Sequence, residues 1–208
     1  MRQKHIPAVV LAAGRSSRMG QPKQLLRYCG ESMLRRAVSI ALAADCDPVV
    51  VVLGADFELV RKELSGTLAR VVVNQNWADG MSSSIRCGIS AVDQITNRDA
   101  NAALLMLCDQ PLVDTDAIRQ LARCYQERAA PIVASKYESN GAAVFGVPAI
   151  FARELFIELK SLDGTAGAKS VIMRHQDQAA FVAQSGAAFD IDTFADYLSL
   201  TSISQFER

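Results

Sequence analysis

The chain has 208 residues, of which 50% are hydrophobic and 21% are charged, a composition typical of a folded domain and not of a disordered chain. Its 22 basic and 22 acidic residues leave no formal net charge, which excludes the overall positive field of most nucleic-acid-binding proteins, so any anion site has to be local. No apolar run approaches the ~20 residues that span a bilayer, and the N-terminal segment lacks the long apolar core of a secretory signal. We therefore expect a cytoplasmic protein without a nucleic-acid or membrane partner.

Apolar runs of strand length alternate with segments of helical periodicity through the first two thirds of the chain. We expect strands at residues 6–10, 49–54, 69–74, 101–108 and 131–135, and helices at 31–44, 56–64, 81–92 and 115–128. Continuous apolar strands of this kind are typical of a sheet that is covered on both faces. The pattern predicts an α/β fold with a single, doubly wound, mostly parallel sheet.

The pattern changes near residue 137. We expect a turn at 139–141, a short strand at 142–145, and a helix that follows Gly146-Val147-Pro148 and ends at 159. A glycine-rich loop at 162–167, a helix at 168–175, short strands at 179–182 and 188–191 and a C-terminal helix complete the pattern. We expect this part to form a small C-terminal α/β lobe over the sheet edge, within one domain of residues 1–208.

The segment LAAGRSSRMGQPK, residues 11–23, directly follows the first expected strand and has the composition of an anion-binding loop. Its small residues let the backbone approach a ligand, Gly14 can take a positive φ, and successive N–H groups can surround phosphate oxygens. Two serines add hydroxyl donors, and Arg18 and Lys23 add the charge that neutralises a phosphate. The residues that we expect to surround the ligand are Leu11, Ala12, Ala13, Gly14, Arg15, Ser16 and Ser17.

Two better-known phosphate loops are excluded by their spacing. The dinucleotide fingerprint GxGxxG is absent because Gly14 and Gly20 stand six residues apart, and the pattern GxxxxGK[ST] fails because Gln21 follows Gly20. An NAD-dependent dehydrogenase is therefore disfavoured.

Two further polar clusters, at residues 74–84 and 109–111, also follow expected strands, and ligands of open α/β sheets lie outside the carboxyl ends of strands. Asp109 suits Mg²⁺, because that ion takes one or two protein carboxylates and fills its other positions with phosphate and water. The alternative is that Asp109 caps the next helix, although Asp114 lies closer to it.

Gly80 and the serines after it predict a helix N-terminus that binds a base or ribose. Trp77 suits either stacking on a ring or packing in the core.

The residues from Leu11 to Leu26 match LAAGxSxRMGxxKxLL at every specified position, and so resemble the signature of nucleotidyltransferases that make nucleoside diphosphate conjugates. NWADGMSSS at 76–84 resembles NxxWxxGMxxS of the molybdenum cofactor cytidylyltransferase family, which is MobA-like, and DIDT at 190–193 resembles an element near the end of these enzymes. GVPAIF at 146–151 and the segment 162–169 resemble GVPALF and LxGDxGAK, except that Thr165 stands where the family has Asp. Threonine can still cap a helix, but it carries no charge.

This resemblance implies a Rossmann-like nucleotidyltransferase fold, with a nucleotide-binding part at 1–136 and an acceptor-side lobe at 137–208. It also implies that Ser84 contacts the nucleotide, and we expect Gly80, at the same helix N-terminus, to bind it as well. Asp190 and Asp192 share one side of an expected strand, which suits a second contact to the metal, although Asp192 is equally suited to cap the last helix.

The activity that the resemblance implies is transfer of CMP from CTP to the terminal phosphate of molybdopterin, with release of pyrophosphate. The catalytic residues are then Arg18, Lys23 and Asp109, and the Mg²⁺ ligands are Asp109, Asp190 and Asp192. Guanylyltransferase relatives usually have Gly-Gly where this chain has Ala12-Ala13-Gly14, and commonly an Asp where Pro22 stands. Both differences favour cytidine.

Two alternatives stay open. A guanylyltransferase, or a cytidylyltransferase that acts on another phosphorylated acceptor, would keep the same loop. A protein of another class, a non-catalytic nucleotide- or cofactor-binding chaperone for a molybdenum enzyme, would bind nucleotide without turnover, and Thr165 would then mark lost catalysis. Release of pyrophosphate separates this class from the enzymes.

Overall fold

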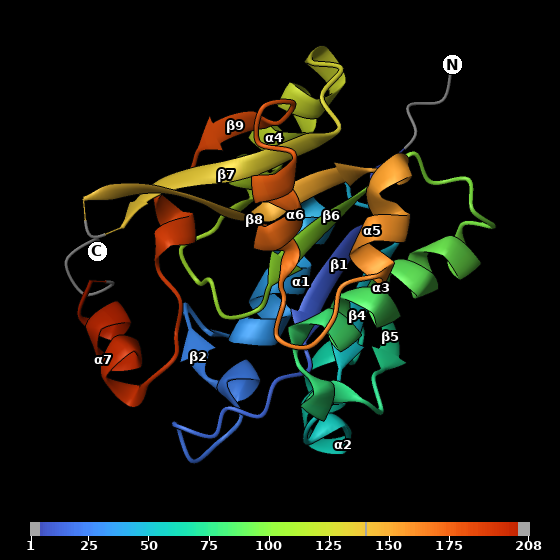
Figure 1. Ribbon diagram of the computed structural model, residues 1–208. Helices are drawn as coiled ribbons and strands as arrows, with labels where there is room; N and C mark the ends of the chain where they lie inside the picture. The colour runs from blue at the N-terminus through green and yellow to red at the C-terminus, as the bar shows by residue number, and fades with distance from the viewer. Residues whose placement is uncertain (1–4, 140, 204–208) are drawn as a thin grey trace.

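A seven-stranded sheet runs through the centre of the computed structural model, which describes residues 5–139 and 141–203 (Figure 1). In spatial order the strands are β5 (Arg70–Val73), β4 (Val49–Leu53), β1 (Ala8–Ala12), β6 (Ala102–Leu107), β8 (Ala142–Ala152), β7 (Ile132–Ser139) and β9 (Ala180–Ala183). The pairs β5–β4, β4–β1, β1–β6 and β7–β9 are parallel, and β8 runs antiparallel to both β6 and β7. The prediction of a mostly parallel α/β sheet is confirmed.

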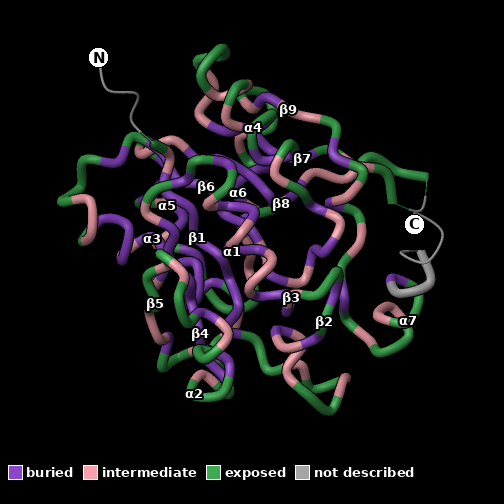
Figure 2. The backbone as a smooth tube through the Cα atoms, turned by 180° about the vertical axis from the view of Figure 1, so that it is seen from behind, coloured by how far each residue is buried: buried purple, intermediate pink, exposed green. Residues whose placement is uncertain are grey.

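Alternate residues of the central strands face two separate cores, because successive side chains of a strand point to opposite faces. Val10 and Leu104 face the core under α1 (Met33–Ala43) and α4 (Thr115–Glu127), and Val9 and Leu105 face the core under α3 (Met81–Ile95), α5 (Phe156–Lys160) and α6 (Ala168–Arg174). Figure 2 shows the central strands as the most continuously buried part of the backbone. The sheet is therefore covered by helices on both faces, as the apolar runs predict.

A third, smaller cluster lies beside the sheet. The hairpin of β2 (Arg27–Tyr28) and β3 (Glu31–Ser32) shares it with α7 (Phe194–Ile203), which Figure 1 shows away from the main helical layers. The remaining short helices are α2 (Phe57–Val60) and the 3₁₀ helices Lys23–Leu25, Arg61–Leu64, Trp77–Asp79, Arg153–Leu155 and Ser185–Ala188. Within the described ranges, no helix combines the length and apolar character needed to cross a membrane.

The expected helix after Gly146-Val147-Pro148 begins later than predicted. Strand β8 continues through these residues to Ala152, and the 3₁₀ helix Arg153–Leu155 and α5, which ends at Lys160, follow it. The register shifts there, since Ala134 faces Ala149 whereas Ser135 faces Gly146, so Val147 and Pro148 form a bulge. A bulge tolerates proline, which has no N–H to donate to the ladder.

Smaller differences have local causes. The first helix begins at Met33 and not at residue 31, because the Ser32 hydroxyl accepts a hydrogen bond from Arg35 N at 3.2 Å and caps it. No strand forms at 188–191; instead Ile191 N donates to Asp109 O at 3.0 Å in an irregular segment. Of the expected turn at 139–141, Asn140 lies outside the described residues.

Candidate active site

Hydrogen bonds between residues at the start and at the end of the loop after β1 hold its two ends together. The buried Gln24 side chain donates from Nε2 to both Ala12 O and Gly14 O at 2.9 Å, and the Ser16 hydroxyl accepts from Lys23 N at 2.8 Å. Sequence reasoning missed Gln24, which stands between Lys23 and Leu25 with no local pattern that marks it as structural. Gly20, with φ of 69°, takes the left-handed turn that was expected of Gly14.

The tip of this loop is open to solvent, whereas its base is buried. Leu11, Ala12 and Ala13 lie in the core, and Gly14, Arg15, Ser17 and Arg18 are exposed. A cavity of about 350 Å³ on one side of the tip is lined by Gly14, Arg15, Ser16, Ser17, Arg18, Lys23 and Asp192. Four of the residues predicted to surround the ligand, Gly14, Arg15, Ser16 and Ser17, thus border one polar hollow together with Arg18 and Lys23, whereas Leu11, Ala12 and Ala13 do not line it.

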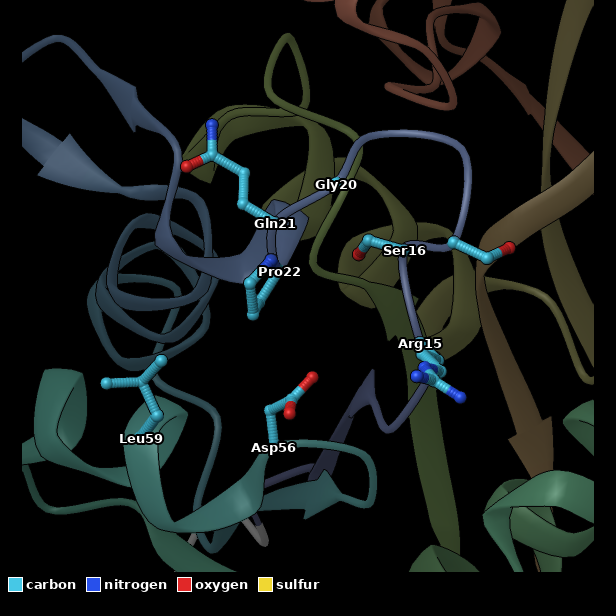
Figure 3. A pocket seen from close by; sticks show the side chains of 8 residues that line it. Arg15, Ser16, Gly20, Gln21, Pro22, Asp56 and Leu59 are labelled. Atoms are coloured by element: carbon cyan, nitrogen blue, oxygen red, sulfur yellow. The ribbon is translucent and has the colours of Figure 1, made fainter.

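A second cavity, of about 430 Å³, lies between the loop and α2 (Figure 3). Its lining residues are Arg15, Ser16, Ser17, Gly20, Gln21, Pro22, Asp56 and Leu59. Figure 3 shows Asp56 and Leu59 across this space from Gln21 and Pro22. The loop therefore separates two hollows and presents Arg15 and both serines to each of them.

Lys23 lies at the centre of a charged cluster that three distant segments bring together. Its ammonium forms an ion pair with Asp109 and another with Asp192 Oδ1 at 3.3 Å, and it donates to Ile191 O at 3.2 Å. Burial alone would lower the pKa of Lys23, but the charge of Asp109 and the hydrogen bond to it outweigh burial and hold the pKa above its ordinary value. Lys23 therefore stays charged, as a group that neutralises phosphate must.

Asp109 lies two residues beyond the end of β6, and its side chain is 13% exposed. Its Oδ1 atom is buried and, among the described residues, has no hydrogen-bond partner. Asp109 does not cap the next helix, because Asp114 does so by accepting a hydrogen bond from Ala117 N at 2.8 Å. An unpartnered buried carboxylate oxygen fits a cation ligand.

The two other predicted metal ligands lie in the same region but differ in role. Asp192 pairs with Lys23 and does not cap α7; Thr193 and Asp196 cap that helix through their reciprocal hydrogen bonds. Burial of its carboxyl and the nearby charge of Asp109 raise the pKa of Asp190 to about 6. No group of three or more His, Cys, Asp or Glu side chains in the described chain is arranged to hold a metal ion. A bound Mg²⁺ would thus take further ligands from phosphate and water.

A third cavity, of about 280 Å³, opens between the loop and the N-terminus of α3. It is lined by Leu11, Ala12, Ala13, Gly14, Arg15, Lys23, Gln24, Trp77, Ala78, Gly80, Met81, Ser84, Leu107, Cys108 and Asp109. Ser84 is held at its wall by a hydrogen bond from Asn74 Nδ2 at 3.1 Å. This cavity brings the predicted Gly80 and Ser84 together with Ala13 and Lys23, although more than fifty residues separate them in the sequence.

The glycine-rich loop 162–167 closes over the start of α3. The Ser82 hydroxyl donates to Gly164 O at 2.7 Å, and a Cβ at Gly80, where φ is 102°, would lie 2.6 Å from that same oxygen. The next helix, α6, has Gly167 at its N-cap without a side-chain hydrogen bond, so Thr165 does not serve as the cap that a threonine there could provide. Thr165 lies instead where this loop packs on Gly80.

Residues 8–179 match the family described as the MobA-like NTP transferase domain. The crystal structure of Rv0371c from Mycobacterium tuberculosis H37Rv is similar, with 32% identity and a TM-score of 0.79 over 96% of this chain and 99% of that chain. A structure of Rv0371c in complex with manganese has 31% identity and a TM-score of 0.75, with the same coverage of 96% and 99%.

Two relatives known from their sequences extend this comparison. The purine catabolism protein PucB of Bacillus subtilis (strain 168) is 28% identical over 95% of this chain and 96% of its own length. Nicotine blue oxidoreductase of Paenarthrobacter nicotinovorans is 35% identical, but the match covers 56% of this chain and 55% of that protein, about half of its length. Because the family match runs from β1 almost to β9, the chain belongs to the MobA-like nucleotidyltransferases.

Proposed function

We propose that this protein transfers CMP from CTP to the terminal phosphate of molybdopterin and releases pyrophosphate. The observation that carries the proposal is the ion pair of Lys23 with Asp109, which lines the same cavity as Ser84 and lies next to the exposed tip of the Gly14–Arg18 loop. This arrangement offers a cation and a carboxylate to a triphosphate, with a hollow for the nucleoside beside them. The acceptor is proposed from the resemblance of the sequence motifs.

The acceptor is already ionised as a phosphate, so the reaction requires no general base. It attacks the α-phosphorus of the nucleotide in line, and catalysis then depends on alignment and on neutralisation of charge. Lys23 and Arg18 contact the triphosphate and balance the charge that develops on the leaving pyrophosphate. The backbone N–H groups of the loop tip surround phosphate oxygens and orient them.

A divalent ion fits this site, because Asp109 Oδ1 is buried and unpartnered among the described residues. Asp109 would hold Mg²⁺, with Asp190 or Asp192 as a second carboxylate, and the ion would supply further charge neutralisation to the phosphates. The manganese complex of Rv0371c supports a divalent ion in this family.

Cytidine is the proposed base, because Ala12-Ala13-Gly14 and Pro22 depart from the guanylyltransferase pattern in the direction of the cytidylyltransferases. The acceptor is proposed to lie on the side of residues 137–208. Asp192 and the loop 162–167 reach the site from this part of the chain. A molybdenum enzyme that receives the product is a proposed partner, and the cytoplasm is the proposed location.

The test is release of pyrophosphate by the purified protein with CTP, Mg²⁺ and molybdopterin. We expect release that depends on the acceptor, that is faster with CTP than with GTP, and that falls on chelation of the metal. Faster turnover with GTP would overturn the base assignment. Turnover with a sugar or alditol phosphate but not with molybdopterin would overturn the acceptor. Nucleotide binding without pyrophosphate release would identify a binding protein in place of an enzyme.

A further inference from the structure

Trp77 is the single tryptophan of the chain, and it lies at the border between core and cavity. It begins the 3₁₀ helix Trp77–Asp79, is half-buried, packs against the core under α3, and lines the cavity of about 280 Å³. It therefore both stacks on the core and presents ring surface to the hollow where the nucleoside is proposed to bind.

The Cβ of Trp77 packs closely against the backbone of Gly54, beside Ala13, on the side of the sheet. A Cβ at Gly54 would lie 2.5 Å from Trp77 Cβ and 2.7 Å from Ala13 O, so the absence of a side chain at Gly54 is what lets Trp77 approach the loop. Ala13 O in turn accepts a hydrogen bond from Ala55 N at 3.0 Å. Because backbone atoms cannot move aside as a flexible side chain can, they prevent Trp77 from shifting toward the sheet.

The turn that carries Trp77 is also closed on its other side. Asp79 N donates to Asn76 O at 3.0 Å, and Gly80 N donates to Trp77 O at 3.3 Å. The residue before this turn is anchored as well, because Asn76 N donates to the Asn74 side chain at 3.0 Å. The backbone and Cβ of Trp77 are thus held in place, and its indole forms part of the wall of the cavity.

The size and lining of the cavity suit one flat ring. Its volume of about 280 Å³ is at the lower limit of small-molecule sites, which usually measure about 300–1,000 Å³. Ala13, Met81 and Leu107 contribute apolar surface, and the fixed Ser84 hydroxyl contributes a polar group. A heteroaromatic ring with an apolar face and a polar edge matches such a lining.

We propose that Trp77 stacks on the nucleobase and, because its position is fixed by Gly54 and Ala13, limits the cavity to a single ring. Trp77 is then the residue that selects pyrimidine over purine nucleoside triphosphates. This inference rests on the proposed nucleotidyl transfer, since it names what determines the base at that same site. Stacking of a base on an aromatic side chain typically changes affinity by roughly ten- to a hundredfold.

The first test uses the emission of the single tryptophan. Addition of CTP with Mg²⁺ is expected to quench the fluorescence of the wild-type protein in a saturable way, with a weaker effect of GTP at the same occupancy. Calorimetry on the same samples supplies the occupancy. If calorimetry shows bound CTP while the emission stays unchanged, Trp77 does not stack on the base, and the proposed transfer reaction is unaffected by that result.

The second test compares kcat/KM for CTP and GTP in Trp77→Leu. Loss of stacking is expected to lower kcat/KM for CTP by roughly tenfold or more, while the larger cavity leaves GTP unchanged or improves it. The CTP to GTP ratio should therefore fall at least tenfold, and Trp77→Phe, which keeps a smaller aromatic ring, should give an intermediate ratio. Tyr125→Leu is the matched control, because it removes a half-buried aromatic side chain from α4, on the opposite face of the sheet.

Circular dichroism and thermal unfolding establish that each variant is folded. If Trp77→Leu does not fold, Trp77→Phe carries the comparison with Tyr125→Leu. An unchanged CTP to GTP ratio in a folded Trp77 variant overturns the inference. If the wild type releases no pyrophosphate with any acceptor, the ratio of CTP and GTP dissociation constants replaces kcat/KM, so failure of the reaction and failure of the stacking role remain distinguishable.

Discussion

The two halves of the central sheet differ in strand direction, in strand length and in the number of functional residues that follow the strands. On the parallel side, formed by β5, β4, β1 and β6, the strands have 4 to 6 residues, and the segments that follow them hold Lys23, Ser84 and Asp109 close together. On the antiparallel side, formed by β8, β7 and β9, strands of 11 and 8 residues make a long hairpin with exposed ends. The functional residues lie together on the parallel side because the carboxyl ends of parallel strands all lie at the same edge of the sheet.

The antiparallel side still contributes to the site, but from a distance. The chain beyond β9 returns across the sheet and places Ile191 O and Asp192 against the Lys23 ammonium. This side therefore supports and completes a site whose central groups belong to the other side. The following substitutions distinguish residues that stabilise the fold from residues that take part in nucleotide binding or transfer.

Phe151→Ala tests the stabilising role of the antiparallel side, and it has the largest expected effect on the free energy of unfolding. Phe151 is fully buried on β8, and loss of a buried phenylalanine typically lowers the free energy of unfolding by about 3–5 kcal/mol. Denaturant titration measures this loss, and Ile157→Ala, at a side chain that is 75% exposed on α5, should change the value by less than about 0.5 kcal/mol. The dissociation constant for nucleotide in the folded fraction should stay the same; a tenfold change would mean that the two sides are not separable.

Lys23→Ala tests the chemistry. Removal of one charge-stabilising group typically costs about 10²–10³ in rate, so pyrophosphate release should fall by that factor. Lys136→Ala removes an equally charged but exposed lysine from β7, on the antiparallel side, and should leave the rate within about twofold. Turnover of Lys23→Ala within a few-fold of the wild type would contradict the catalytic role of this lysine.

Gln24→Glu tests whether the loop is held in its closed shape by the buried amide. A carboxylate cannot donate to Ala12 O and Gly14 O, and buried groups left without a partner typically cost about 1–3 kcal/mol, so the dissociation constant for nucleotide should rise roughly tenfold. Gln184→Glu is the matched control on the antiparallel side, where a buried glutamine donates to Ala117 O at 3.2 Å. It should lower stability without weakening nucleotide binding, and an equal loss of binding in both variants would refute the special role of Gln24.

Asp190→Asn has the smallest expected effect, and it depends on pH. Because the pKa of Asp190 is raised to about 6 in the folded protein, from an ordinary 3.8, the folded state binds the proton more tightly than the unfolded state does. Its contribution is thus fully favourable below about pH 4 and is lost as the pH rises through about 6. The variant should be more stable than wild type near pH 7.5 by less than about 1 kcal/mol, because the residue as a whole is exposed and solvent screens the charge of its partly buried carboxyl. The two proteins should be equally stable near pH 4. An equal difference at both values of pH would contradict this.

The parallel side could be predicted from the sequence, because each buried strand is a continuous apolar run and the site residues lie in the segments that follow these runs. Lys23 and Asp109 could be singled out for this reason, although their direct ion pair could not. The antiparallel side was harder to predict. Gly146 and Pro148 normally end a strand, and they continue β8 only because a bulge opposite Ala134 and Ser135 accommodates them.

Long-range hydrogen bonds account for the rest of what the sequence does not reveal. The contact of Lys23 with Asp192 joins residues 169 positions apart, and no local pattern signals it. The same holds for Gln24, whose amide is recognisable as structural only once Ala12 O and Gly14 O are seen to converge on it.

The place of β1 in the sheet also affects how the protein is made. It is an early segment of the chain, yet it lies between two later strands, with Ala8 opposite both Val49 and Leu104. While the ribosome is still adding β6, one edge of this apolar strand has no partner and is open to pairing with other chains. Parallel pairing over such a long sequence separation is also slow to form. Nascent chains should therefore depend on protection by a chaperone until Leu104 and its neighbours have left the exit tunnel.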